Sequence, residues 1–167
     1  MKEIKIFLAS SINEFRVERN AIGDFIRRLQ DKFIEYDIYF DLFECEFHDN
    51  TITSSDRTQL VYNEIAKKSD LFFMLIGKRA GEFTVEEYME VRNVSALEKY
   101  VIFYGNDQDE TVLSIKTIVN QDTLTNVVTT NDLKEILEVF KGAIEKELNN
   151  EYRIIVDEQK IRIESSL

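Results

Sequence analysis

The feature that most constrains the fold is an unbroken apolar run of six residues, Leu71–Ile76, with the sequence LFFMLI. A run of this length without polar alternation is typical of a strand buried on both faces, as in a parallel sheet covered by helices. Gly77 ends the run and Gly81 permits a second turn, with the cations Lys78 and Arg79 between them. The segment therefore predicts a strand, a glycine loop and a helix start, which is where open α/β sheets bind ligands.

The rest of the chain is predicted to alternate between strands and helices. Further strands are expected at Ile4–Ala9, Asp37–Phe43, Tyr100–Tyr104 and Asn126–Val128. Apolar residues spaced three and four apart predict helices over residues 15–33, 56–68, 84–99 and 131–148. The segment Val112–Val119 is compatible with a helix or a strand. This alternation predicts an α/β fold with a doubly wound, parallel five-stranded sheet of order 2-1-3-4-5.

The last part of the chain differs in composition from the part before it. Residues 1–150 are predicted to form the α/β domain. Residues 151–167 contain two short apolar segments around Asp157 and Glu158, which predict a C-terminal β-hairpin. The same tail, from Asn149 to Leu167, is also compatible with an exit into a further domain or with a strand that pairs at an interface.

Composition excludes several classes of function. The net charge of -11 argues against a general nucleic-acid or anionic-membrane surface, although a few local cations could hold a small anion. Cys45 is the single cysteine, so neither an internal disulfide nor a cysteine zinc cluster can form, and a cytoplasmic setting is favoured. His48 is the single histidine and lies in a polar segment, so we expect no catalytic triad and no metal site.

The expected sheet order places the ends of the first and third strands side by side. Ser10 and Ser11 follow the first strand, and they could cap the next helix or receive a phosphate or ribose there. Arg19 could form a surface or rim ion pair with Glu18 or Asp24. Alternatively, it could face this crevice and hold a diphosphate or orient Glu87. Lys78 and Arg79 could be solvated loop cations or ligands of the same anion.

Glu87 is the carboxylate of greatest interest, and it has two interpretations. Thr84 and Glu87 have the spacing of a capping box, which by itself would explain a glutamate at this position. Alternatively, Glu87 could stabilise an oxocarbenium-like ribose during glycosidic cleavage, with Glu82 and Glu86 as other candidates.

Two other side chains could contact a nucleotide. Asp41, placed near the end of the second strand, could accept a hydrogen bond from a ribose hydroxyl. Phe83 could stack on a base or ring, but packing in the core or under a lid is the commoner role for a phenylalanine.

Two segments carry motifs of a known family. The first, IKIFLASSINEFRVERNAI, has a Lys-Ile-Phe strand, a double serine and a Glu-Arg pair on the helix, and it resembles the opening of bacterial TIR-like domains. DRTQLVYNEIAKKSDLFFMLIGKRAGEFTVEEYMEV is similar to a second pattern in related modules. The residues that match this second pattern are Arg57, Gln59, Tyr62, Asn63, Asp70, Gly81, Thr84 and Glu87.

The resemblance implies a flavodoxin-like fold and kinship with TIR domains that hydrolyse NAD+, and more distantly with nucleoside deoxyribosyltransferases. It implies that Glu87 is the carboxylate that acts on the N-glycosidic bond, with NAD+ as substrate and no prosthetic group. It also implies self-association and a fused or partner sensor domain in an antiphage defence or signalling protein. A non-catalytic module that binds a nucleotide signal or self-assembles is the alternative. The tryptophan that often precedes the catalytic glutamate in eukaryotic TIR enzymes is absent, since the chain has no tryptophan.

Overall fold

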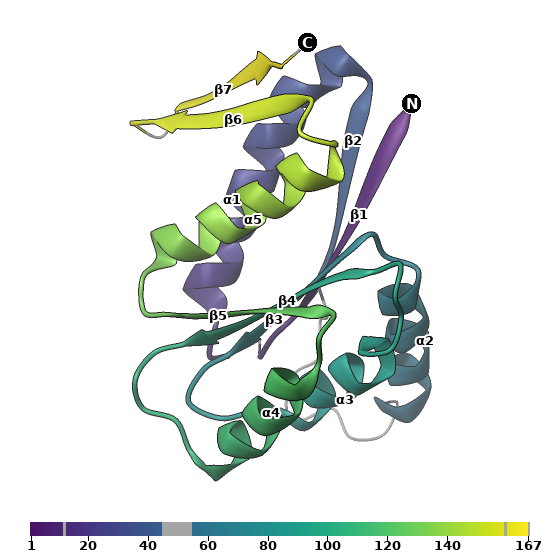
Figure 1. Ribbon diagram of the computed structural model, residues 1–167, viewed down its shortest axis with the longest axis vertical. Helices are drawn as coiled ribbons and strands as arrows, with labels where there is room; N and C mark the ends of the chain where they lie inside the picture. Colours follow the sequence, from purple (N-terminus) through teal and green to yellow (C-terminus); the bar gives the residue numbers. More distant parts are fainter. Residues whose placement is uncertain (12, 45–54, 159, 167) are drawn as a thin grey trace.

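The computed structural model describes residues 1–11, 13–44, 55–158 and 160–166, and for residues 55–58 and 83 the backbone alone. The strands of the main sheet are β1 (Lys2–Ala9), β2 (Ile38–Glu44), β3 (Leu71–Ile76), β4 (Glu98–Tyr104) and β5 (Thr125–Thr130). The helices are α1 (Arg16–Phe33), η1 (Ile34–Tyr36), α2 (Ser55–Lys67), α3 (Glu82–Val91), α4 (Glu110–Gln121) and α5 (Leu133–Glu147). Two further strands, β6 (Tyr152–Asp157) and β7 (Lys160–Ser165), form a separate hairpin (Figure 1).

The main sheet is parallel throughout and has the order β2-β1-β3-β4-β5, so the predicted fold class is confirmed. All six residues of β3 are buried, as expected for a central strand with helices on both faces. Asp70 sets the pairing of β1 with β3, because its carboxylate accepts a 2.8 Å hydrogen bond from the Lys5 amide while its own amide donates to the Lys5 carbonyl. The residues predicted for the sheet centre are buried: Ile6, Phe7, Leu8, Phe73, Leu75, Ile102 and Phe103.

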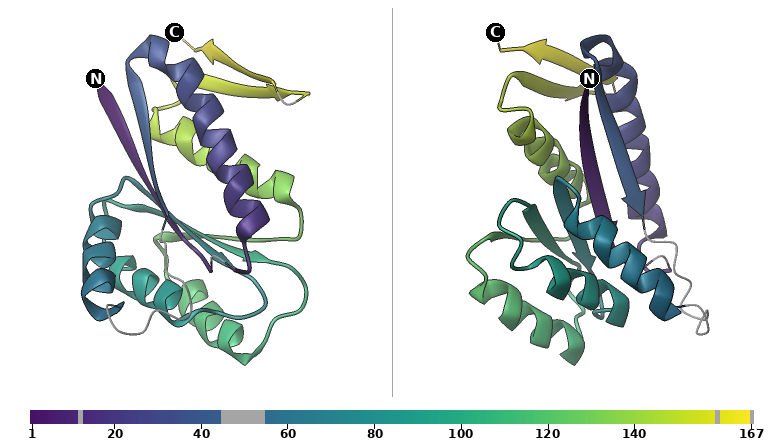
Figure 2. Two further views of the ribbon diagram at one scale, coloured as in Figure 1. Left: turned by 180° about the vertical axis from the view of Figure 1, so that it is seen from behind. Right: turned by 90° about the vertical axis from the view of Figure 1, so that its right-hand side faces the viewer.

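The helices form two layers on opposite faces of the sheet (Figure 2). Helices α1 and α5 cover one face, where a first apolar cluster includes the stacked rings of Phe73 and Phe140, with centroids 3.7 Å apart. Helices α2, α3 and α4 cover the other face, where a second apolar cluster includes Phe72 and Tyr88. Because alternate side chains of each strand point to opposite faces, β1 supplies Ile6 to the first cluster and Phe7 to the second.

The C-terminal hairpin packs on the first cluster rather than extending the main sheet. Its strands pair with each other in an antiparallel ladder, as predicted for residues 151–167. Ile154 and Ile161 are buried in the first cluster against α1 and α5, and Tyr152 packs edge-on against Phe33. The tail is therefore already paired and packed within the molecule, which removes the reason to expect an interface strand there.

Several predicted boundaries are wrong because local signals compete. Helix α3 ends at Val91 rather than near Lys99, since residues 98 and 99 already belong to β4. Helix α5 begins at Leu133 rather than at residue 131, because Asp132 is its N-cap and accepts from the Lys134 amide through its side chain. The ambiguous segment at Val112–Val119 is helical, and Asp109 caps it.

Within the described part of the chain, we find no helix that is both long enough and apolar enough to span a bilayer.

Candidate functional site

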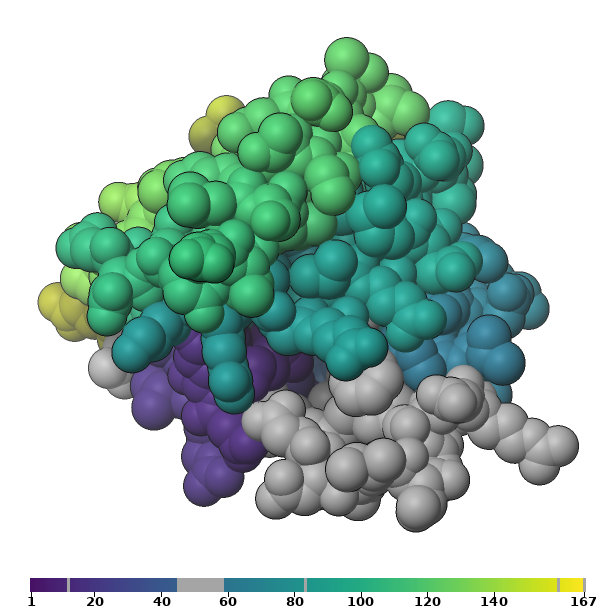
Figure 3. Space-filling model, turned by 90° about the horizontal axis from the view of Figure 1, so that it is seen from below, coloured from purple at the N-terminus to yellow at the C-terminus, as the bar shows by residue number. Residues whose placement is uncertain are grey.

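The carboxyl ends of β1 and β3 lie next to each other, as the sheet order requires. Ala9 pairs with Met74 in the ladder, so Ser10 and Ser11 emerge beside the segment Gly77–Lys78. Figure 3 shows this face of the molecule, with the start of α1 in purple beside the teal segment that follows β3. The candidate site is therefore assembled from the residues that follow β1, the glycine loop after β3, and the facing parts of α1, α2 and α3.

Arg19 points into the molecule instead of into solvent. It is 8% exposed, and its guanidinium donates to the Ser10 hydroxyl at 3.1 Å and to the Ser10 carbonyl at 3.4 Å. Its Nε lies 3.9 Å from a carboxylate oxygen of Glu44 at the end of β2. A surface ion pair with Asp24 is wrong, because Arg19 is buried while Asp24 lies at the surface and pairs with Arg27. Arg19 thus joins α1 to the carboxyl ends of β1 and β2.

Glu87 is a buried carboxylate that faces helix α2. It is 2% exposed, and one of its oxygens accepts a 3.3 Å hydrogen bond from Gln59 Nε2. The same Gln59 nitrogen donates to Asn63 Oδ1 at 2.8 Å, which fixes which end of the Gln59 amide faces Glu87. Gln59 Oε1 is buried and has no hydrogen-bond partner within the described residues. The neighbouring Tyr62 packs edge-on against Phe43.

The capping-box interpretation of Glu87 is wrong. Helix α3 begins at Glu82 and its N-cap is Gly81, so Thr84 lies inside the first turn and is itself buried. Gly81 has no side chain to accept from the helix amides, and its carbonyl accepts from the Val85 amide. The simplest structural reason for a glutamate at position 87 is therefore removed. Glu82 and Glu86 are exposed.

A contact that the sequence did not reveal joins the loop before α1 to the glycine loop after β3. A carboxylate oxygen of Glu14 accepts a hydrogen bond from the Lys78 amide and lies directly against Gly77. A Cβ added at Gly77 would lie 2.6 Å from Glu14 Cδ and 2.9 Å from Phe15 Cζ. The close contact of these two side chains with the backbone at position 77 therefore requires glycine. Ser11 holds the loop before α1 in place, because its hydroxyl accepts a 3.4 Å hydrogen bond from the Glu14 amide.

Of the remaining candidate residues, Lys78 and Arg79 lie at the site and Asp41 lies away from it. Lys78 and Arg79 are exposed at the glycine loop, and Lys78 Nζ lies 3.9 Å from Asp107. Asp41 is not at the end of its strand: it is exposed in the middle of β2, where it lies opposite Lys5 in the β1–β2 ladder. It lines a hollow of about 280 Å³ with Ile65 and Ser69, near the amino end of β3. The side chain of Phe83, together with Cys45 and His48, lies outside the described residues.

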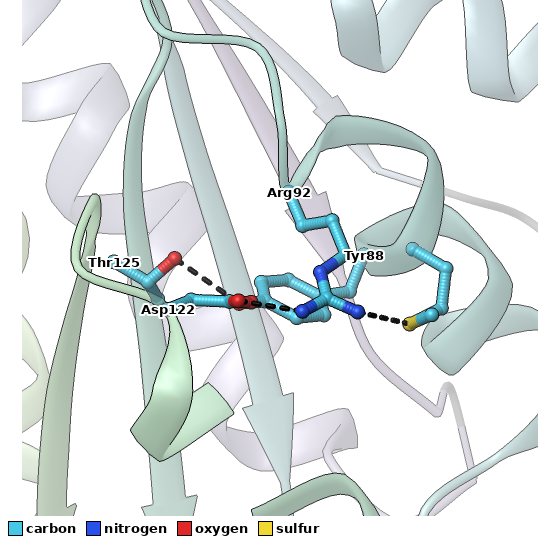
Figure 4. Close-up of polar contacts among 5 residues, drawn as sticks. Tyr88, Arg92, Asp122 and Thr125 are labelled. Carbon is cyan, nitrogen blue, oxygen red and sulfur yellow. Dashed lines mark hydrogen bonds and ion pairs between the residues drawn. The ribbon is translucent and has the colours of Figure 1, made fainter. Parts of the chain in front are cut away.

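A second, partly buried polar cluster anchors the other half of α3 (Figure 4). The Tyr88 hydroxyl donates to Asp122 at the end of α4 and lies 3.1 Å from Thr125 Oγ1. Arg92 donates to the second oxygen of Asp122 at 2.6 Å. Burial, together with the hydrogen bond to Asp122, raises the pKa of Tyr88 far above its usual value, so the hydroxyl stays a donor. This cluster lies at the amino end of β5, away from Glu87, and fixes the position of α3.

Asp122→Ala is expected to lower the free energy of unfolding by about 2 kcal/mol, because it leaves a largely buried guanidinium and hydroxyl without their acceptor. Urea denaturation measures this cost. Gln121→Ala, at an exposed neighbour on the same helix, should change stability by less than about 0.5 kcal/mol. Equal costs for the two variants would show that the cluster adds nothing to stability.

The part of the chain that the structure describes contains no group of three His, Cys, Asp or Glu side chains arranged to hold a metal ion.

Neither the protein-family models nor the curated proteins with which the sequence was compared give a match. The site therefore has to be interpreted from its own geometry.

Proposed function

We propose that this chain is a TIR-like NAD+ nucleosidase that hydrolyses the nicotinamide–ribose bond, in a bacterial antiphage defence or signalling protein. The observation that carries the proposal is Glu87: a buried carboxylate on the helix that follows the central strand, beside Gln59 and not in a helix cap. Carboxylates in such positions stabilise positive charge that develops on a sugar ring. The motif resemblance of the two segments supports the same role.

The reaction needs little from the protein beyond this charge. As the bond between the ribose C1′ and the pyridinium nitrogen breaks, its electron pair neutralises the nicotinamide, which leaves as a neutral molecule. C1′ acquires oxocarbenium character, water attacks it, and the water proton is released with ADP-ribose as the second product. Glu87 stabilises the cation and can accept from a ribose hydroxyl. Gln59 Oε1, which is buried beside it, supplies a second acceptor for such a hydroxyl.

In this proposal, Arg19, Lys78 and Arg79 hold the diphosphate of the dinucleotide. Arg19 has a guanidinium oriented by Ser10, and Arg groups of this kind bind phosphate oxygens well. Lys78 and Arg79 stand exposed at the adjacent loop and can add charge for the same diphosphate. Thr84 lies on the first turn of α3, one helical turn before Glu87. Asp41, near the amino end of β3, has no part in this proposal.

A non-catalytic nucleotide-binding module is the second candidate, and the burial of Glu87 favours it. The Glu87 side chain is 2% exposed and accepts a hydrogen bond from Gln59. A chain that binds a nucleotide signal through Arg19 and the loop cations alone would not require Glu87 to be ionised or accessible.

Incubation of concentrated protein with NAD+, followed by chromatography of the products, tests the proposal. We expect nicotinamide and ADP-ribose in equal amounts. Binding of NAD+ in calorimetry without product would support the module instead. Transfer of the deoxyribosyl group from a deoxyribonucleoside to a free base, with release of the original base and no loss of NAD+, would identify the deoxyribosyltransferase type. No binding and no turnover at high protein concentration would contradict the proposal.

A further inference from the structure

The outer edge of β5 differs from every other strand edge in the described structure. β5 is the last strand of the main sheet, and no strand in the described residues pairs with its far side. Its sequence, TNVVTT, contains no charged residue, although 32% of the chain is charged. By contrast, β2 at the opposite edge has Asp41 and Glu44. The hairpin strands have charged residues as well: Arg153 and Asp157 on β6, and Lys160, Arg162 and Glu164 on β7.

Charged residues on an edge strand are a common way to prevent one sheet from pairing with another. Their absence from β5 leaves its free amides and carbonyls as a template for another strand. The strand is also accessible, because Asn126, Val127 and Thr129 are exposed. Leu124, just before the strand, is 52% exposed, so an apolar residue lies at its start as well.

The surface beside β5 has room for the side chains of an added strand. A hollow of about 390 Å³ lies between β5 and α5, lined by Val128, Val139 and Gly142 among others. A Cβ at Gly142 would meet no atom within 4 Å, so the helix surface is open there. Glu138 is the carboxylate of this hollow, and it is paired with Lys141 at 3.6 Å. An added strand would therefore meet a largely apolar, electrically neutral surface.

We propose that this edge pairs with the β5 edge of a second copy of the chain, in an antiparallel ladder that joins two five-stranded sheets into one. The occupant follows from charge. Two copies with a net charge of -11 each repel one another over most of their surfaces. At β5 and its hollow, two copies can meet without placing like charges against each other. This proposal does not depend on NAD+ chemistry.

The symmetry of such a pair restricts its register. A twofold axis perpendicular to the sheet keeps the faces of both copies aligned, so residues of the same alternation phase lie opposite each other. In the two registers with the greatest overlap, Val127 lies opposite Val127 or Thr129 of the second copy, and Val128 lies opposite Asn126 or Val128. All of these pairs are uncharged, and β-branched residues pair well across strands.

Sedimentation velocity over about a hundredfold range of concentration tests the pairing. We expect a monomer–dimer equilibrium that becomes tighter at higher salt, because salt screens the repulsion between the copies. Val127→Lys and Thr129→Lys should each shift the equilibrium by at least about tenfold toward monomer, although each reduces the net negative charge. Val61→Lys, at an exposed position on α2, should leave the equilibrium unchanged. A wild-type chain that is monomeric throughout the range would overturn the proposal.

Cysteine cross-linking identifies the register and provides a second measurement. In a Cys45→Ser background, Val127→Cys and Val128→Cys each place one thiol on the strand. Opposite residues in an antiparallel pair have Cα atoms about 4.5–5.5 Å apart, within disulfide range. One variant should therefore form a covalent dimer under mild oxidation, and the other should do so poorly. A dimer that forms while neither variant cross-links, and while Val61→Cys does, would place the interface elsewhere.

Discussion

Glu87→Gln is expected to reduce the release of nicotinamide from NAD+ by about a hundredfold or more, because the amide has no negative charge opposite the oxocarbenium ion. The buried hydrogen bond from Gln59 can persist, since the new amide oxygen can accept it in place of the carboxylate. The free energy of unfolding should therefore change by no more than about 1 kcal/mol. Product chromatography and urea denaturation on the same preparation separate the two effects.

Glu86→Gln is the matched control, since it makes the same chemical change at the adjacent, exposed position. It should retain the wild-type rate and stability. If Glu87→Gln keeps most of the turnover, the carboxylate is structural and the proposed mechanism is wrong. If both variants lose activity equally, the loss comes from the net charge of α3 and not from one carboxylate.

Gly77→Ala should destabilise the fold by about 3 kcal/mol, as overpacking of a close contact does. The added methyl group would lie 2.6 Å from Glu14 Cδ and 2.9 Å from the ring of Phe15, which is buried in the first cluster. Gly142→Ala on α5 is the control for the same substitution, because a Cβ there meets nothing within 4 Å. It should be neutral or stabilise the helix by up to about 1 kcal/mol.

A double-mutant cycle with Glu14→Ala tests the reason for this cost. Removing the Glu14 carboxylate relieves part of the clash, so Gly77→Ala should cost about 1 kcal/mol less in that background. The remaining cost reflects Phe15. Strict additivity of the two substitutions would show that Glu14 does not contact the loop in solution.

The sheet could be predicted because its signals are local and agree with each other. LFFMLI is buried as a central strand, and alternation with apolar helix stripes predicts a doubly wound sheet, for which 2-1-3-4-5 is a common order and the one observed. The sequence of Val112–Val119 does not distinguish helix from strand, because its many β-branched residues favour a strand while its spacing favours a helix. In the structure the segment is helical, and its buried residues Val112, Ile115 and Val119 lie on one face of α4.

The site was harder to predict, because its contacts join residues that are far apart in the chain. Glu14 and Lys78 are 64 positions apart, and Tyr88 and Asp122 are 34 apart, so no local pattern indicates either pair. The error at Thr84 has a different origin. A glycine and a threonine three residues apart can both begin a helix, and only the backbone conformation shows that Gly81 does so.

The two apolar clusters differ in how much of the chain must be synthesised before each can close. The second cluster draws on residues from Phe7 to Val119, so it can form before α5 has been made. The first cluster also needs Ile136 and Phe140 from α5, and Ile154 and Ile161 from the hairpin. The apolar face of α1 therefore waits for the last part of the chain. Helix α1 is consequently covered in full only after the hairpin has been synthesised, and its apolar face needs protection from aggregation until then.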